Sequence, residues 1–243
     1  MTHDDTDTQE TEGDNARRFR RADVVMEVHY RSAGSFLVSY SLNLSKGGLF
    51  LETDDLLPIG TRLSVSFTIP GAAQAVEGQA EVIWLRENPS DEGPRGLGLQ
   101  FDALEKNIGK QIDAMISGFG GVHLMAVAGD APTITRLSQY LHSVISCDVP
   151  EQTPREISEV GFPEVPDLLL LDLDSAGEEG LRTIAVALQW QPAVPVVAIS
   201  RVEALRVQAQ DQGAAVVLDN PPPFKQLRRR ILEVLARPSA HSR

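Results

Sequence analysis

The stretch "PDLLLLDL", residues 166–173, places four consecutive leucines between two aspartates. A continuous apolar run of this length is typical of a strand that is covered on both faces, as in a parallel sheet. Such a strand needs helices above and below it, so the residues around it should alternate between strand and helix patterns. The stretch therefore predicts an α/β domain.

The flanking sequence has that alternation from residue 122 to residue 236. Expected strands are "VHLMAVA", "VISCDV", "PDLLLLDL", "PVVAIS" and "AAVVLD", and each is followed by a helical stretch, the last being "FKQLRRRILEVLA". Five βα units of this kind predict a doubly wound, flavodoxin-like sheet whose functional edge lies at the carboxyl ends of the strands. We expect four polar residues to gather at that edge: Asp130, Asp172, Ser200 and Asn220.

The sequence before residue 118 has a different pattern. Short alternating runs, separated by turn-rich segments, cover residues 24–30, 35–44, 48–53, 62–70, 75–86 and 96–101. They predict a small all-β barrel of six strands. Residues 103–117 carry apolar side chains at helical spacing and predict a trailing helix, followed by "GFGG" as a hinge.

Composition limits the function. The chain of 243 residues has a formal net charge of −12, and residues 1–16 form an acidic stretch that we expect to be a disordered tail. No basic face of the size that DNA binding needs is expected, and no apolar run is long enough for membrane insertion. Cys147 is the single cysteine, which excludes an internal disulfide and a zinc site built from cysteines. A cytoplasmic protein without enzymatic activity is the simplest interpretation, since no catalytic triad or nucleotide-binding glycine loop is found.

Two motifs in the first half carry a resemblance. Arg17 and Arg21 form RxxxR within "NARRFRRADVV" (15–25), and "NLSKGG" (43–48) places Asn43, Ser45 and Gly48 in the pattern [D/N]xSxxG. In this order, on a six-strand pattern, they resemble the PilZ domain over roughly residues 17–118. The resemblance implies a six-stranded barrel that binds the bacterial second messenger cyclic di-GMP.

The residue types suit that ligand, which joins two phosphodiester anions to guanine edges. An arginine fork can meet a guanine edge or a phosphate bidentately, so Arg17 and Arg21 would clamp the ligand from a flexible arm. Asn43 and Ser45 would offer polar groups, and Gly48 would permit a close approach of the backbone. Two further arginines, Arg18 and Arg20, would add positive charge. Surface arginines beside an ordinary Asn/Ser/Gly turn remain the alternative interpretation.

The second half, residues 122–237, resembles the receiver domain of two-component response regulators. Asp172 stands where receivers carry the phosphoacceptor, Gly180 follows eight residues later, and Ser200 takes the hydroxyl position. Three departures weaken this resemblance. Gly129 precedes Asp130 where receivers usually have two adjacent acids. Asn220 replaces the lysine of the last strand, and Val217 replaces the aromatic residue at the switch position.

These departures weaken phosphorylation, which needs Mg²⁺ and a cation at the phosphoryl oxygens. Asp130 and Asp172 remain as candidate Mg²⁺ ligands, but with one acid lost they would bind the ion only weakly. No metal or cofactor is therefore expected unless the receiver is active. A pseudo-receiver that serves as a docking module is the favoured interpretation.

Three functional hypotheses follow. The first is a cyclic di-GMP sensor and adaptor that signals to an unidentified protein partner through the pseudo-receiver. The second is a ligand-independent scaffold in motility or polarity control. The third is a response regulator phosphorylated at Asp172. Homodimerisation stays open, and residues 238–243 are expected to form a short tail.

Overall fold

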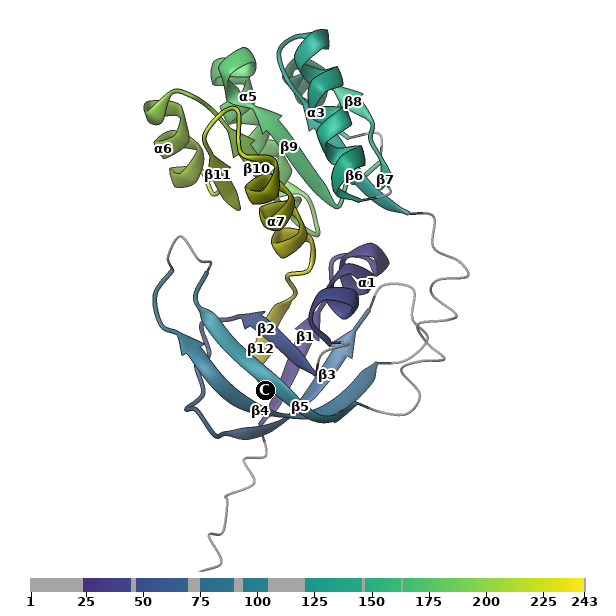
Figure 1. The fold of residues 1–243 in the computed structure, drawn as a ribbon, viewed down its shortest axis with the longest axis vertical. Helices are drawn as coiled ribbons and strands as arrows, with labels where there is room; N and C mark the ends of the chain where they lie inside the picture. The colour runs from purple at the N-terminus through teal and green to yellow at the C-terminus, as the bar shows by residue number, and fades with distance from the viewer. Residues whose placement is uncertain are drawn as a thin grey trace, which may run out of the picture.

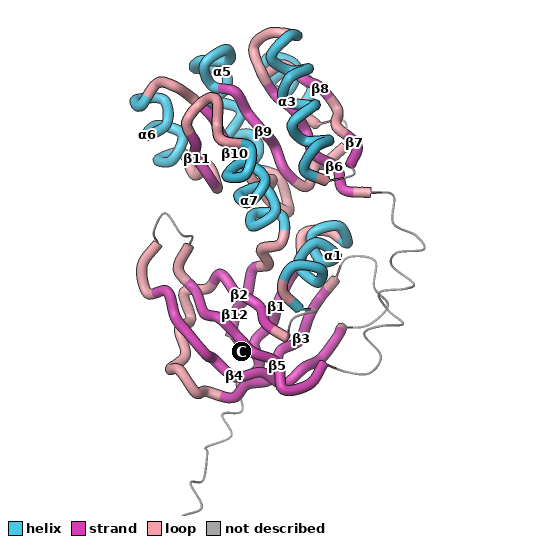
Figure 2. The backbone as a smooth tube through the Cα atoms, viewed as in Figure 1, coloured by secondary structure: helices cyan, strands magenta, loops and turns pink. Residues whose placement is uncertain are grey.

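A computed structural model describes residues 24–44, 47–69, 75–89, 94–104, 121–145, 147–162 and 164–242. They form two lobes, one dominated by strands and one in which helices cover a sheet (Figures 1 and 2). Among the described residues, no helix has the length and apolar character required to span a membrane.

The first lobe is a strongly curled sheet. Its strands are β1 (Val25–His29), β2 (Gly48–Glu52), β3 (Arg62–Thr68), β4 (Val76–Arg86), β5 (Gly96–Leu104) and β12 (Ser239–Ser242). They follow the order β1-β12-β2-β5-β4-β3, and β1 also pairs with β3, so the edges of the sheet meet. Alternate side chains such as Leu63, Val65 and Phe67 of β3 point into a continuous apolar core. We call this lobe, with helix α1 (Ala33–Leu42), the barrel domain.

One predicted strand is wrong. Residues 35–44 were expected in the sheet, yet α1 occupies Ala33–Leu42. Ser32 caps this helix by accepting a hydrogen bond of 3.0 Å from the backbone N–H of Ser35. Phe36 is fully buried in the barrel core, whereas Val38 is 7% exposed and belongs to the core of the other lobe. Because both sides of the helix are covered, its apolar residues do not follow the one-sided spacing that normally identifies a surface helix.

The strand missing at 35–44 is replaced from the far end of the sequence. The residues expected as a tail include β12, which pairs antiparallel with β1 from Met26–Ser242 to His29–Ser239. A single pair, Ser239–Glu52, joins β12 to β2. The predicted trailing helix is also partly wrong, because β5 continues through Leu104; the rest of 103–117 lies outside the described residues.

The second lobe confirms the predicted alternation of strands and helices. Its elements are β6 (Val122–Val127), α3 (Ala131–Val144), β7 (Cys147–Asp148), β8 (Glu151–Gln152), α4 (Pro154–Val160), β9 (Leu168–Asp172), α5 (Leu173–Gln189), β10 (Val196–Ile199), α6 (Glu203–Asp211), β11 (Val216–Leu218) and α7 (Phe224–Leu235). The strand order β11-β10-β9-β6-β7, with β8 also on β6, is the flavodoxin-like order. We call this lobe the α/β domain.

Successive leucines of β9 point to opposite faces of this sheet. Leu168 and Leu170 pack with α3 and α7, whereas Leu169 and Leu171 pack with α4, α5 and α6. All four are fully buried, as a parallel strand covered on both faces requires.

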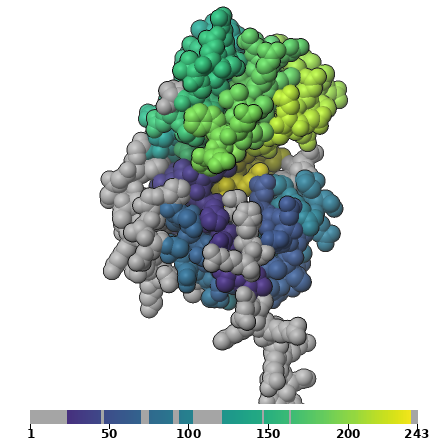
Figure 3. Space-filling model, turned by 180° about the vertical axis from the view of Figure 1, so that it is seen from behind, coloured from purple at the N-terminus to yellow at the C-terminus, as the bar shows by residue number. Residues whose placement is uncertain are grey.

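Helix α1 and the end of α7 join the two domains. The Arg31 guanidinium donates a hydrogen bond of 3.0 Å to the carbonyl oxygen of Val234, and Arg237 forms an ion pair of 3.5 Å with Glu52. Ser32 donates a hydrogen bond to the carboxylate of Asp167 in the α/β domain. From behind, the purple N-terminal and yellow C-terminal segments meet where the lobes touch (Figure 3).

Candidate functional site

The residues predicted to bind a ligand are only partly described. Asn43 and Gly48 lie in the described part, whereas Arg17, Arg18, Arg20, Arg21 and Ser45 lie outside it. The meeting of the arginines with the "NLSKGG" turn therefore stays a prediction.

Asn43 follows α1 directly. Its backbone N–H donates to the carbonyl oxygen of Ser39 at 2.9 Å, and its own carbonyl oxygen accepts from the N–H of Gly48 at 3.3 Å. Gly47 has a φ of +81°, a backbone conformation that favours glycine. A Cβ atom on Gly48 would lie 3.3 Å from the carbonyl oxygen of Leu99, so a side chain there would require this backbone to shift by a few tenths of an ångström.

An aromatic platform lies beside Asn43 on the outside of the barrel. The rings of Phe50 and Trp84 stack with centroids 5.1 Å apart and an interplanar angle of 12°. The guanidinium carbon of Arg86 lies 5.0 Å from the Phe50 centroid and 5.3 Å from that of Trp84, within the range of a cation–π interaction. We call Phe50, Trp84 and Arg86 the aromatic platform.

Two glycines of β5 make room for this platform. A Cβ atom on Gly98 would fall 2.0 Å from Nε1 of Trp84. One on Gly96 would fall 2.0 Å from the carbonyl oxygen of Leu51 and 2.7 Å from the Phe50 ring. The alternation in "GLGLQF" therefore reflects the close approach of the Trp84 ring at Gly98, and of the β2 backbone and the Phe50 ring at Gly96.

Asn43 and the platform line a cavity of about 190 Å³. Glu233, Ala236 and Arg237 close it from the other side, at and just beyond the end of α7. Both domains thus contribute to one pocket. Sequence reasoning missed the platform, although Trp84 and Arg86 sit two residues apart in "VIWLR", on one face of a strand.

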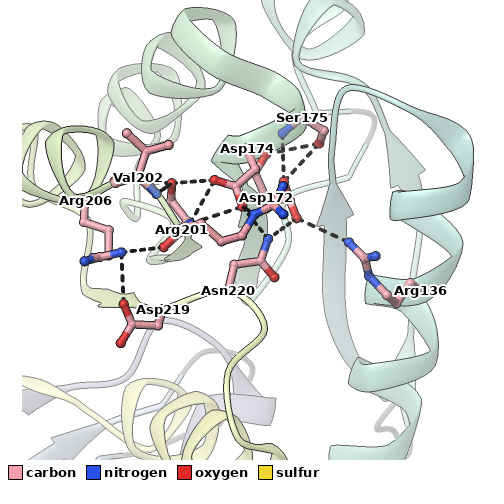
Figure 4. Close-up of polar contacts among 10 residues, drawn as sticks. Arg136, Asp172, Asp174, Ser175, Arg201, Val202, Arg206, Asp219 and Asn220 are labelled. Atoms are coloured by element: carbon pink, nitrogen blue, oxygen red, sulfur yellow. Dashed lines mark hydrogen bonds and ion pairs between the residues drawn. The ribbon is translucent and has the colours of Figure 1, made fainter.

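A second group of polar residues lies at the carboxyl ends of the α/β strands (Figure 4). Asp172 ends β9 and its side chain is only 2% exposed. Its carboxylate accepts hydrogen bonds from Nδ2 of Asn220 at 2.9 Å and from the N–H and hydroxyl of Ser175 at 2.9 and 3.1 Å. Arg136 of α3 adds an ion pair of 3.5 Å. Both carboxylate oxygens of Asp172 are therefore engaged by neighbouring groups.

Asp174 holds the other half of this group together. It accepts hydrogen bonds from the Ser200 hydroxyl at 2.7 Å, from Nδ2 of Asn220 at 2.8 Å and from the backbone N–H of Arg201 at 2.9 Å. Burial alone would raise the pKa of this carboxyl, but the hydrogen bonds from Ser200, Arg201 and Asn220 outweigh it and lower the pKa below its usual value. Asp174 is therefore held as a carboxylate.

Asp130 does not join Asp172 through any hydrogen bond in the described part of the chain. It is exposed and caps α3 by accepting from the N–H of Thr133 at 2.9 Å. A Cβ atom on the preceding Gly129 would fall 2.1 Å from the carbonyl oxygen of Ser175, so the first turn of α5 occupies the space of a side chain there. Within the residues described, no three His, Cys, Asp or Glu side chains are grouped as metal ligands would be.

Of the four polar residues predicted at this edge, the structure brings three together: Asp172, Ser200 and Asn220. Asp174, Arg136 and Arg201 were missed. The "DLD" of 172–174 carried a signal for Asp174, because alternate residues at a strand end can reach one edge of the sheet. Nothing in the local sequence marks Arg136, whose partner lies 36 residues away in another element.

The fold and these contacts define a two-domain protein in which a barrel domain is joined to a flavodoxin-like α/β domain. Residues 15–118 match the PilZ domain family. A search of curated proteins finds no match.

Several solved receiver domains are similar to the α/β half. One is the signal receiver domain of a DNA-binding response regulator from Colwellia psychrerythraea (17% identity; 47% of this chain and 98% of that chain; TM-score 0.41). Another is the receiver domain of a two-component histidine kinase from Clostridium thermocellum (14%; 48% and 98%; TM-score 0.42). A third is the receiver domain of the response regulator TorR of the TMAO respiratory system (23%; 46% and 96%; TM-score 0.39).

Proposed function

We propose that this chain is a sensor and adaptor: it binds cyclic di-GMP on the barrel domain and passes the signal to a protein partner through the α/β domain. The PilZ match over residues 15–118 supports the ligand. The observation that carries the proposal is the pocket beside Asn43, which the barrel domain and the end of α7 line together.

The pocket has the chemistry that a guanine nucleotide requires. Trp84 is 39% exposed and offers an aromatic surface on which a base can stack. Arg86 and Arg237 offer guanidinium groups for a phosphate or a guanine edge, and the Asn43 side chain offers an amide for hydrogen bonding.

A cavity of about 190 Å³ is smaller than the roughly 300 Å³ at the lower end of ligand pockets, so it would take one base or one phosphate. The remainder of the dinucleotide would lie over the opening, where Arg17 and Arg21 would close on it, with Arg18 and Arg20 adding charge. Ser45 and Gly48 would face the ligand beside Asn43.

Transmission would begin at α7. A ligand in this pocket would touch Glu233 and Arg237, and Arg237 forms the ion pair with Glu52 that joins the two domains. Binding would therefore alter the contacts between the domains directly. The α/β domain would act as a docking module without phosphorylation, because Asp172 is buried and its oxygens are engaged.

Calorimetric titration with cyclic di-GMP tests the proposal. Wild type should bind with saturation, and both Arg21→Ala and Asn43→Ala should bind at least about tenfold more weakly, because a hydrogen bond to a charged group contributes about 1.5–3 kcal/mol. Arg155→Ala, at an exposed arginine of α4, is the matched control and should bind as wild type does.

Hydrogen exchange of α7 adds a readout for transmission. At a ligand concentration that saturates wild type but not Asn43→Ala, exchange at the end of α7 should slow in wild type and change less in the variant. If wild type shows no saturable heat, the sensor is excluded and the ligand-independent scaffold takes its place. If the ligand binds but leaves exchange in α7 unchanged, the proposal that the chain binds cyclic di-GMP is kept and the proposal that α7 transmits the signal is rejected.

A further inference from the structure

A larger cavity, of about 490 Å³, lies between the two domains. Arg31, Glu52 and Pro94 line it from the barrel domain, and Val216, Arg230 and Val234 line it from the α/β domain. It lies at the amino-terminal ends of β10 and β11, the opposite edge of the sheet from Asp172. Its volume falls within the roughly 300–1,000 Å³ of small-molecule sites, which often occur at domain interfaces.

The charged residues lining this cavity are unbalanced. They are three arginines, Arg31, Arg230 and Arg237, against the single carboxylate of Glu52. The side chains of Arg230 and Arg237 are only 14% and 17% exposed. In a chain with a net charge of −12, the lining of this cavity is locally positive.

One of these arginines has a donor to spare for a ligand. Arg237 pairs with Glu52 at 3.5 Å and Arg230 with Glu233 at 3.2 Å. Arg31 uses one terminal nitrogen on the Val234 carbonyl, while its buried Nε has no acceptor among the described residues. A buried donor without an acceptor costs free energy that a bound anion would recover.

Burial also raises the cost of holding these charges. It lowers the pKa of Arg31 and of Arg237. Asp167 raises the pKa of Arg31 and Glu52 raises that of Arg237, whereas repulsion from Arg237 lowers the first and repulsion from Arg230 lowers the second. Both remain cations at neutral pH. An anion placed among these arginines would relieve that repulsion.

We propose that this interdomain cavity is a second binding site, for a small molecule that carries a phosphoryl group. Guanidinium forks match the geometry of phosphate oxygens, and the apolar walls formed by Pro94, Val216 and Val234 would cover the uncharged part of the molecule. Because residues of both domains line the cavity, an occupant would hold the domains together. This cavity and the pocket beside Asn43 are separate, although Pro94 and Arg237 line both. The proposed second site does not depend on cyclic di-GMP binding.

Pyrophosphate is the probe, titrated by calorimetry into the full chain. Wild type should give a saturable heat. Arg31→Gln and Arg230→Gln should each weaken binding by about tenfold or more, and Arg155→Gln, at an exposed position, should not. The pair of cavity variants guards against a folding defect in one of them, and the midpoint of urea unfolding identifies such a defect. Succinate, a dicarboxylate, should bind more weakly than pyrophosphate.

Four results would overturn the proposal: no saturable heat in wild type, equal affinity of the cavity and control variants, succinate binding as tightly as pyrophosphate, or complete displacement of pyrophosphate by cyclic di-GMP. The last would make the cavity part of the messenger site. Cyclic di-GMP could fail to bind while pyrophosphate binds to wild type and Arg230→Gln abolishes the pyrophosphate binding. That result would support the second site and reject only the proposed cyclic di-GMP sensor.

Discussion

The hydroxyl of Ser35, in the barrel domain, donates a hydrogen bond of 2.6 Å to the backbone carbonyl oxygen of Leu235, at the end of α7 in the α/β domain. Arg31 donates to the neighbouring carbonyl oxygen of Val234 at 3.0 Å. The last carbonyl groups of a helix lack partners within the helix and attract cations. Barrel-domain side chains therefore cap a helix of the other domain.

We expect Ser35→Ala to lower the free energy of unfolding by about 1–3 kcal/mol, since the substitution leaves a buried carbonyl oxygen without its donor. Urea unfolding followed by circular dichroism measures it. Ser143→Ala, at an exposed position of α3, is the control and should change the free energy by less than about 0.5 kcal/mol. Equal effects of the two substitutions would contradict the capping role of Ser35.

Gly129→Ala should destabilise the α/β domain by about 1–3 kcal/mol or more, because its Cβ would lie 2.1 Å from the backbone oxygen of Ser175. Gly48→Ala serves as a milder comparison. Its Cβ would lie 3.3 Å from the carbonyl oxygen of Leu99, so this substitution should destabilise the chain less. Thermal unfolding of the two variants ranks them. A neutral Gly129→Ala would mean that the first turn of α5 moves away freely.

The hydrogen bonds to Asp174 predict a dependence of stability on pH. They lower its pKa in the folded chain, so their stabilisation is complete above the usual pKa of about 3.9 and is lost as the pH falls through the folded value. Asp174→Asn should be less stable than wild type at pH 7, and its free energy of unfolding should fall less steeply below about pH 4. Urea unfolding at a series of pH values measures both, with Asp211→Asn on the exposed surface of α6 as control. Parallel curves for Asp174→Asn and wild type would exclude this role.

Asp172 should resist phosphorylation. With acetyl phosphate and Mg²⁺, we expect the intact mass of the chain to remain unchanged, because the carboxylate is buried against Asn220, Ser175 and Arg136. A receiver of established activity run in parallel checks the reagent. A phosphoryl adduct in wild type that Asp172→Asn removes would establish the response-regulator hypothesis instead.

Sequence alone predicted the α/β domain because each element there is covered in the usual way. The leucine run of β9 is buried on both faces, and α3 presents one apolar side to the sheet. The local pattern therefore contains the information that the fold uses.

Two elements of the barrel domain escaped prediction because their partners are distant in sequence. Helix α1 is covered by two domains, and the contact that fixes Ser35 comes from Leu235, 200 residues away. Strand β12, "SAHS", has no strand-like alternation, and its pairing with β1 is made by backbone groups.

The candidate sites likewise include contacts that the sequence predicted and contacts that it did not. Asp172 and Asn220 were expected to meet at the sheet edge, and they do, at 2.9 Å. Asp130 was expected with them but caps its own helix. The aromatic platform and the interdomain arginines depend on how strands and domains meet, which no local motif encodes.

Strand β12 also imposes an order on biosynthesis. It is translated after the entire α/β domain, yet it pairs with β1, close to the beginning of the described chain. Although domains commonly fold as they emerge from the ribosome, N-terminal domain first, here the sheet begun by β1 is completed only after the α/β domain has been synthesised. A nascent chain stalled before residue 239 would expose the edge of β1 that β12 covers, and an unpaired strand edge can pair with another chain.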